Sequence, residues 1–154
     1  MKTSGPCGQR KKSYWRRWPC SAAKREEITL DDKALFRLAK DALRNAYAPY
    51  SEFSVGAALL TETGEVYTGV NVENSSFGAT ICAERTAFVK AVSDGHRRFK
   101  AIAIASSGGK AWPCGICRQF MYEFGDALTV ITGSDENHLE KYDIKELLLE
   151  GFRL

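Results

Sequence analysis

The sequence predicts an α/β fold of three layers, α-β-α, in which helices cover both faces of a mixed five-stranded sheet. From residue 30 onward, helical and strand-like apolar patterns alternate along the chain. The first two strand patterns and the last two are each joined by a connection too short to hold a crossover helix, so each pair should be antiparallel. Helices separate the strands between them, as in layered α/β folds.

The first half of the domain reads as a helix followed by a hairpin. Thr29, with Asp32 three residues later, resembles a helix N-terminus. Apolar residues then recur at helical spacing until Pro49 ends the run. The segments "FSVGAALL" (53–60) and "EVYTGVNVE" (65–73) are each typical of a strand, and the turn "TETG" between them predicts an antiparallel hairpin.

The second half alternates helices with strands. The expected elements are a helix over about 81–93, the strand 99–106, a helix over about 114–124, the strands 127–132 and 138–144, and a terminal helix near 144–150. The link "GSDEN" between the last two strands is too short for a crossover helix, so this pair is expected to be antiparallel.

Charge divides the chain into a basic leader and an acidic domain. Residues 1–29 carry eight Lys/Arg and two Asp/Glu, whereas the other 125 residues carry 14 and 17. The leader has no apolar segment of signal-peptide length, and no run in the chain reaches the ~18 apolar residues of a membrane span. We therefore expect a cytoplasmic protein without a membrane partner, with a disordered leader over 1–28 and one folded domain over 29–154. Aromatic residues among the leader's basic ones leave nucleic-acid or membrane-surface binding as the alternative.

Three cysteines of the domain, Cys82, Cys114 and Cys117, indicate a metal site. Each lies at or next to the start of a predicted helix, where unpaired N–H groups and the helix dipole favour thiolates. The domain has no fourth cysteine, and surface positions are expected for its two histidines, His96 and His138. Three ligands without a fourth are typical of a catalytic zinc. Thiol–disulfide exchange and structural zinc are the other common uses of C-x-x-C.

Glu84, two residues after Cys82, is a candidate proton carrier. In mid-helix two such side chains point ~200° apart, but in the first turn both can approach one pocket. A carboxylate beside metal-activated water can carry protons to a substrate. Three thiolates leave a divalent cation with a net negative charge, and Arg85 is the candidate to offset it. A glutamate that only complements the helix dipole and a solvated arginine are the simpler alternatives.

"CAERTA", followed at this distance by "PCGICRQ", resembles the cytidine deaminases in their short, homotetrameric form with three cysteine ligands. The resemblance spans roughly Leu30 to Phe152. It implies that the three cysteines bind one Zn²⁺ per chain and that Glu84 is the catalytic proton shuttle. The implied reaction is hydrolytic deamination of cytidine and deoxycytidine to uridine and deoxyuridine, with release of ammonia, in pyrimidine salvage.

The same resemblance assigns substrate contacts within "PYSEFSVGAALLTETGEVYTGVNVEN" and beyond it. Asn71 and Glu73, two apart on a predicted strand and so on one face, correspond to residues that hydrogen-bond the ribose. Phe53 corresponds to the aromatic residue that packs on the base. Backbone groups at Ala83 and beside Pro113 would read the pyrimidine edge.

Other substrate contacts implied by the resemblance come from neighbouring subunits of the tetramer, through Ser75, Phe77 and Phe152. Two positions depart from the family pattern. Phe77 stands where tyrosine is common, and Trp112 stands where a small hydroxyl residue often precedes the proline. Without the resemblance, Phe53 and Phe152 could be ordinary core residues.

Rival functions differ in substrate or in the role of the metal. A nucleic-acid base editor with the leader as its basic arm is one, although such enzymes typically ligate with H-x-E and "NVEN" suits a free ribose. A binding module with a structural zinc is another, and it predicts a fourth protein ligand. Deamination of aminoglycosyl-nucleoside antibiotics is a third. We expect a free nucleoside as the substrate and no nucleic-acid partner.

Overall fold

The computed structural model describes residues 30–153, so the predicted leader lies outside the described residues. The helices are α1 (Asp32–Ala42), α2 (Ala83–Ser93), α3 (Gly115–Tyr122) and α4 (Ile144–Leu147), with 3-10 turns η1 (Leu43–Asn45) and η2 (Phe77–Ala79). The strands are β1 (Val55–Thr61), β2 (Val66–Val70), β3 (Phe99–Ser106), β4 (Thr129–Gly133) and β5 (Leu139–Asp143). None of the described helices has the length and apolar character needed to cross a bilayer.

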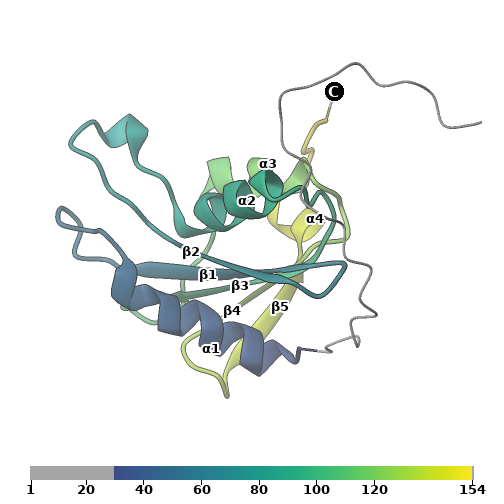
Figure 1. Cartoon of the computed structure of the whole chain (residues 1–154), viewed down its shortest axis with the longest axis horizontal. Coiled ribbons are helices and arrows are strands. Elements are labelled where there is room, and N and C mark those ends of the chain that lie inside the picture. Colours follow the sequence, from purple (N-terminus) through teal and green to yellow (C-terminus); the bar gives the residue numbers. More distant parts are fainter. Residues whose placement is uncertain (1–29, 154) are drawn as a thin grey trace, which may run out of the picture.

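The five strands form one mixed sheet in the order β2-β1-β3-β4-β5. Strand β1 pairs antiparallel with β2 and β3, β3 pairs parallel with β4, and β4 pairs antiparallel with β5. Both antiparallel pairings predicted from the short connections are therefore confirmed. Helix α1 covers one face of the sheet, and α2, α3 and α4 cover the other, which confirms the three-layer fold (Figure 1).

The first helix begins later than its sequence signal predicts. Asp31 caps α1, because its carboxylate accepts a hydrogen bond from the backbone N–H of Ala34 at 2.6 Å. Thr29, the predicted first residue, lies outside the described residues. An aspartate is as good a cap as a threonine, and it stands immediately before the first helical residue.

The first helix also ends earlier than predicted. Regular α-helix gives way to η1 after Ala42, so the prediction that the helix runs to Pro49 was wrong. The reason is tertiary pairing, since Tyr47 donates its N–H to the carbonyl of Asn71 at 3.0 Å and forms an isolated bridge to Val72. Helix α4 likewise ends at Leu147, short of the expected residue 150.

Successive residues of the central strands point into two separate cores. In β3, Ile102 and Ile104 pack toward α2 and α3, whereas Ala103 and Ala105 pack toward α1. A strand buried on both faces reads as an unbroken apolar run, which explains the pattern "FKAIAIAS". Strand β1 alternates in the same way: Ala57 and Leu59 belong to the first core, and Ala58 and Leu60 belong to the second.

Gly69 in β2 lets the start of α2 approach the sheet closely. A Cβ at this position would lie 2.3 Å from the carbonyl oxygen of Ala83 and 2.4 Å from the nitrogen of Ala87, so no larger residue fits. This contact holds the first turn of α2 against β2. That turn carries Glu84 and begins at Cys82.

Candidate active site

The sulfur atoms of Cys82, Cys114 and Cys117 converge at one point of the structure. All three lie within 4.8 Å of one another, and the Sγ atoms of Cys82 and Cys114 are 3.8 Å apart. A tetrahedral zinc with Zn–S bonds of about 2.3 Å holds its sulfur ligands about 3.8 Å apart. Among the described residues, no histidine, aspartate or glutamate joins this group. The arrangement fits a zinc ion with three protein ligands.

Two helix starts bring the cysteines together. Cys82 is the N-cap of α2 and Cys114 is the N-cap of α3, where its sulfur accepts a hydrogen bond from the N–H of Cys117 at 3.5 Å. The prediction that the cysteines lie at helix starts is confirmed. The positive ends of both helix dipoles therefore meet at the sulfur atoms, an arrangement that complements the negative charge of a thiolate-bound metal site.

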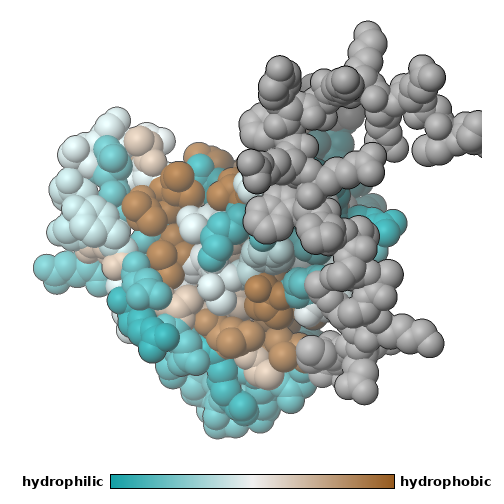
Figure 2. Space-filling view, viewed as in Figure 1, coloured by the Kyte–Doolittle hydropathy of each residue, from teal (hydrophilic) through white to brown (hydrophobic). Residues whose placement is uncertain are grey.

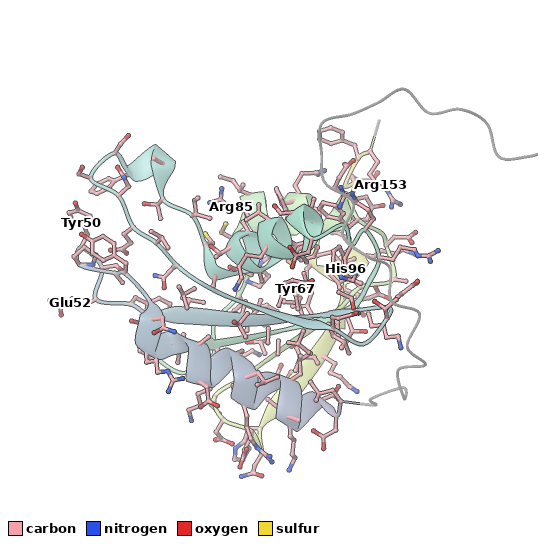
Figure 3. The ribbon with its side chains drawn as sticks, viewed as in Figure 1. Tyr50, Glu52, Tyr67, Arg85, His96 and Arg153 are labelled. Carbon is pink, nitrogen blue, oxygen red and sulfur yellow. The ribbon has the colours of Figure 1, made fainter. Side chains whose placement is uncertain are left out.

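Arg85 lies against the sulfur group rather than in solvent. Its Nη2 donates to the carbonyl of Thr80 at 2.9 Å and lies 3.8 Å from the Sγ of Cys82, and its Nε is buried without a hydrogen-bond partner (Figure 3). A hydrogen bond from Cys117, together with Arg85, lowers the pKa of Cys82 to about 5. Donating that hydrogen bond and being buried raise the pKa of Cys117. The guanidinium thus offsets negative charge on sulfur.

Glu84 is the second residue of α2 and is almost fully buried, with 4% of its surface exposed. Burial raises the pKa of Glu84 to about 7, and the neighbouring Cys82 charge acts in the same direction. A carboxyl group that titrates near neutrality can both take up and release a proton at physiological pH. Glu84 and Cys82 line the same cavity, as expected for residues in the first turn of a helix.

The cavity beside the cysteines has a volume of about 400 Å³, within the range of small-molecule sites. It brings together many of the predicted site residues: Phe53, Asn71, Glu73, Cys82, Ala83, Glu84 and Cys114. The predicted substrate-binding residues Phe53, Asn71 and Glu73 therefore meet the start of α2 at one concave surface.

Asn71 forms hydrogen bonds with the chain at the start of β1 through both the oxygen and the nitrogen of its side-chain amide. Its Oδ1 accepts from the N–H of Val55 at 2.8 Å, and its Nδ2 donates to the carbonyl of Phe53 at 2.8 Å. Only 8% of its surface is exposed. In this structure Asn71 therefore braces the backbone around Phe53 at the cavity wall.

Glu73 holds the neighbouring loop. Its carboxylate accepts from the N–H groups of Tyr50 at 2.9 Å and Ser51 at 3.2 Å, and also from the Ser51 hydroxyl. These hydrogen bonds, the hydroxyl one foremost, lower the pKa of Glu73. The carboxylate is therefore ionised at neutral pH and faces the cavity as an acceptor.

The family model for the cytidine and deoxycytidylate deaminase zinc-binding region matches residues 29–133. The chain belongs to this deaminase family. It is 46% identical over 125 residues to the cytidine deaminase of Sporosarcina psychrophila, covering 80% of this chain and 92% of that protein. Over 101 residues it is 54% identical to a probable cytidine deaminase of Dictyostelium discoideum, covering 64% and 69%. The solved cytidine deaminase from Burkholderia pseudomallei superposes with a TM-score of 0.75 at 44% identity, over 79% of this chain and 99% of that one.

Three of the predicted substrate-binding residues, Ser75, Phe77 and Phe152, do not line the cavity. Cys117 and Arg85 do not line it either, but both contact Cys82, which does. Phe77 belongs to η2, on a loop that projects beyond the sheet, and it is 75% exposed (Figure 1). Phe152 follows α4 and is 65% exposed. The alternative that Phe152 is an ordinary core residue is wrong for the chain described, and Phe53 is likewise too exposed, at 40%, to be one.

Lys110 and Trp112 line the cavity, and sequence reasoning missed the lysine. The Nζ of Lys110 lies 2.6 Å from the Oε2 of Glu140 and 4.4 Å from the ring centroid of Trp112. A loop lysine carries no motif, so its pairing with a residue of β5 becomes visible only in the fold. The bulky Trp112 contributes to this cluster and faces Tyr142, at a centroid distance of 4.7 Å.

Arg118 is a second residue that sequence reasoning missed. Its Nε donates to the carbonyl of Pro113 at 2.8 Å, and its Nη1 donates to the carbonyl of Leu147 at 2.9 Å. It therefore holds the backbone beside Pro113, which the resemblance assigns to the pyrimidine edge. A signal was present, because Arg118 directly follows Cys117 inside the motif "PCGICRQ".

Proposed function

We propose that this protein hydrolyses cytidine and deoxycytidine to uridine and deoxyuridine with release of ammonia, as a cytoplasmic enzyme of pyrimidine salvage. The observation that carries the proposal is a buried carboxyl group, Glu84, on the wall of the cavity that the convergent cysteines border. The family match and the relatives named cytidine deaminase support it. A cytoplasmic location would keep the site cysteines, which are free thiols here, reduced for metal binding.

In this proposal Cys82, Cys114 and Cys117 would hold one Zn²⁺ per chain, and the ion would supply an activated water for attack at C4 of the pyrimidine. Glu84 would take up one proton of that water and deliver it to N3. It would then take the remaining proton from the hydroxyl group formed at C4 and deliver it to the leaving amine. One water is consumed, and one ammonia leaves. Arg85 offsets the excess negative charge of three thiolates.

The remaining cavity residues orient the nucleoside. Phe53 packs on the base, and backbone groups of Ala83 and beside Pro113 read its edge. An ionised carboxylate has about four acceptor sites, and Glu73 uses three for Tyr50 and Ser51, which leaves one for a ribose hydroxyl. Asn71 uses one acceptor position of Oδ1 for Val55 and one N–H of Nδ2 for Phe53, which leaves one of each for a ribose hydroxyl.

The direct test is to incubate purified, zinc-loaded protein with cytidine and to follow uridine formation. Turnover of free cytidine supports the proposal. Deamination of single-stranded RNA with no action on cytidine would favour a nucleic-acid editor instead. A zinc-saturated protein inactive on both substrates would favour a binding module.

Cytidine is expected to be a better substrate than cytidine monophosphate. Glu73 is ionised, and the cavity's one lysine among the described residues, Lys110, is already paired with Glu140. The phosphate of the nucleotide and this solvent-exposed carboxylate repel each other through water, so the neutral nucleoside should be favoured by up to about fivefold. The measurement is kcat/KM for both substrates.

The variants Glu73→Gln and Lys110→Met identify the source of this discrimination. Glu73→Gln should narrow the difference between the two substrates, because it removes the repelling charge. Equal constants in the wild type would contradict the prediction, as would a Gln variant that discriminates just as strongly. If Lys110→Met weakens only the nucleotide, the lysine recognises phosphate and the argument from its pairing with Glu140 is wrong.

We further propose that the protein is a homotetramer in which Ser75, Phe77 and Phe152 complete the cavities of neighbouring subunits. The surface supports assembly, because hydrophobic side chains gather on one face over α2, β2 and α1 (Figure 2). The exposed apolar residues on and beside these elements include Leu38, Val72, Ile81 and Val89. Patches of this kind on a soluble domain commonly mark contact sites between proteins.

Phe152 is held in place although its ring is exposed, which fits a contact made to another subunit. Gln119 donates to its carbonyl at 2.8 Å, and the guanidinium of Arg153 lies 4.7 Å from the ring of Tyr122 (Figure 3). Phe152→Ala is expected to lower kcat/KM for cytidine roughly tenfold and to weaken the tetramer, since buried aromatic anchors dominate interfaces. Light scattering and kinetics on the same samples check both effects, and a fully active monomer would refute the proposal.

A further inference from the structure

The ring of Phe53 lies with one edge against Gly108, in the turn that follows β3. A Cβ built on Gly108 would lie 2.7 Å from Cε2 and 3.3 Å from Cδ2 of the Phe53 ring, closer than van der Waals contact allows. Glycines with positive φ in the described chain are Gly64, Gly95, Gly109 and Gly125, and Gly108 is not among them. The backbone at Gly108 therefore does not require glycine, whereas the Phe53 ring does.

The backbones on either side of this contact are fastened to each other. The N–H of Ser107 donates to the carbonyl of Ser54 at 2.9 Å, and the N–H of Ser54 donates to the hydroxyl of Ser107 at 3.1 Å. Asn71 fixes the carbonyl of Phe53 from the other side. The segment before β1 cannot move away from the turn after β3 without breaking these hydrogen bonds.

The turn that carries Gly108 is itself closed. Ser106 and Gly109 form an isolated bridge, and the hydroxyl of Ser106 donates to the carbonyl of Gly109 at 2.7 Å. A side chain added at Gly108 would therefore meet a fixed turn on one side and the ring on the other. The ring is the softer partner, because it can rotate about its side-chain bonds into the cavity that it lines.

We propose that Gly108 is a positioning residue: its missing side chain forms the seat of the Phe53 ring and so sets the width of the cavity where the pyrimidine binds. The inference rests on the proposed function only for the identity of the ligand. A bulkier residue at Gly108 would tilt the Phe53 ring toward the bound base and narrow the part of the cavity that the base occupies.

The variant Gly108→Ala is expected to raise KM for cytidine roughly tenfold with a smaller change in kcat, because packing on the base contributes equally to ground-state and transition-state binding. Zinc content should stay unchanged. Gly95→Ala is the matched control. Its Cβ meets no atom within 4 Å, but its φ is +100°, so the variant should lose stability without a change in KM.

The decisive experiment is a double-mutant cycle with Phe53→Ala, measured by kinetics and by thermal unfolding. In the Phe53→Ala background the added methyl has room, so Gly108→Ala should change neither KM nor stability further. If Gly108→Ala alone fails to fold, the double variant should fold and thereby support the seat. An unchanged KM in the single variant, or the same factor in both backgrounds, would overturn the inference.

The thermal-unfolding measurements test the contact between Gly108 and Phe53 independently of the proposed function. If the wild-type protein does not deaminate cytidine, the proposed function fails, but the coupling between Gly108 and Phe53 in unfolding free energy can still be measured. Absence of that coupling overturns the seat itself, whether or not the protein is active.

Discussion

Replacing Glu84 with glutamine is expected to leave zinc binding and nucleoside binding intact while turnover falls by ~10²–10⁴-fold, with a greater loss if water orientation suffers too. Glutamine has nearly the same size and keeps a carbonyl acceptor, so the closely packed first turn of α2 need not rearrange. It cannot carry a proton from water to the base. The effect on the chemical step is therefore separated from effects on the fold.

The measurements are kcat with cytidine, zinc content, and the equilibrium binding of uridine as a non-reacting ligand. Glu146→Gln is a matched control, since Glu146 also lies in the first turn of a helix and accepts from the N–H of Asp143 at 2.7 Å. Glutamine serves equally well in that capping box, so activity should be unchanged. A Glu84→Gln variant that retains more than a tenth of the wild-type rate would contradict the role of Glu84 as proton shuttle.

Local signals in the sequence were enough to predict most of the fold and the metal site. Short connections are enough to predict both antiparallel pairs, because a link of about four to five residues leaves no other geometry. The cysteine positions follow from helix-start signals and spacing, so the convergence of Cys82, Cys114 and Cys117 could be anticipated without coordinates. The position of Glu84 follows from the first turn of its helix, where it can approach the same pocket as Cys82.

Side-chain partners distant in sequence could not be anticipated. Asn71 has the right chemistry for a ribose, but its amide bonds Phe53 and Val55, and only the fold shows that these groups are adjacent. Lys110 likewise meets Glu140 across thirty positions of sequence. Helix ends were missed for the same reason, since the pairing of Tyr47 with Asn71 ends the helical run before Pro49 does.

Cys114 combines two roles, and its replacement is expected to cost the protein its metal. It is one of three converging sulfur atoms, and its sulfur also caps α3 by accepting from the N–H of Cys117. Cys114→Ala leaves two ligands and an uncapped helix, whereas Cys114→Ser keeps a cap oxygen but offers zinc a hydroxyl in place of a thiolate. Loss of a cap costs about 1 kcal/mol, far less than loss of a zinc ligand.

Both Cys114 variants should therefore lose most of their zinc and their activity, and only the alanine variant should also show a further loss of stability in the metal-free protein. Metal analysis after dialysis and thermal unfolding with and without a chelator separate the two effects. In the wild type the chelator should lower the unfolding temperature, because metal binding adds to folding free energy. Cys20→Ser is the control, since Cys20 matches no ligand spacing and its replacement should leave zinc at one ion per chain. Near-full zinc occupancy in either Cys114 variant would contradict the assignment of the three-cysteine site. A zinc deficit in Cys20→Ser would mean that the leader also contributes a zinc ligand.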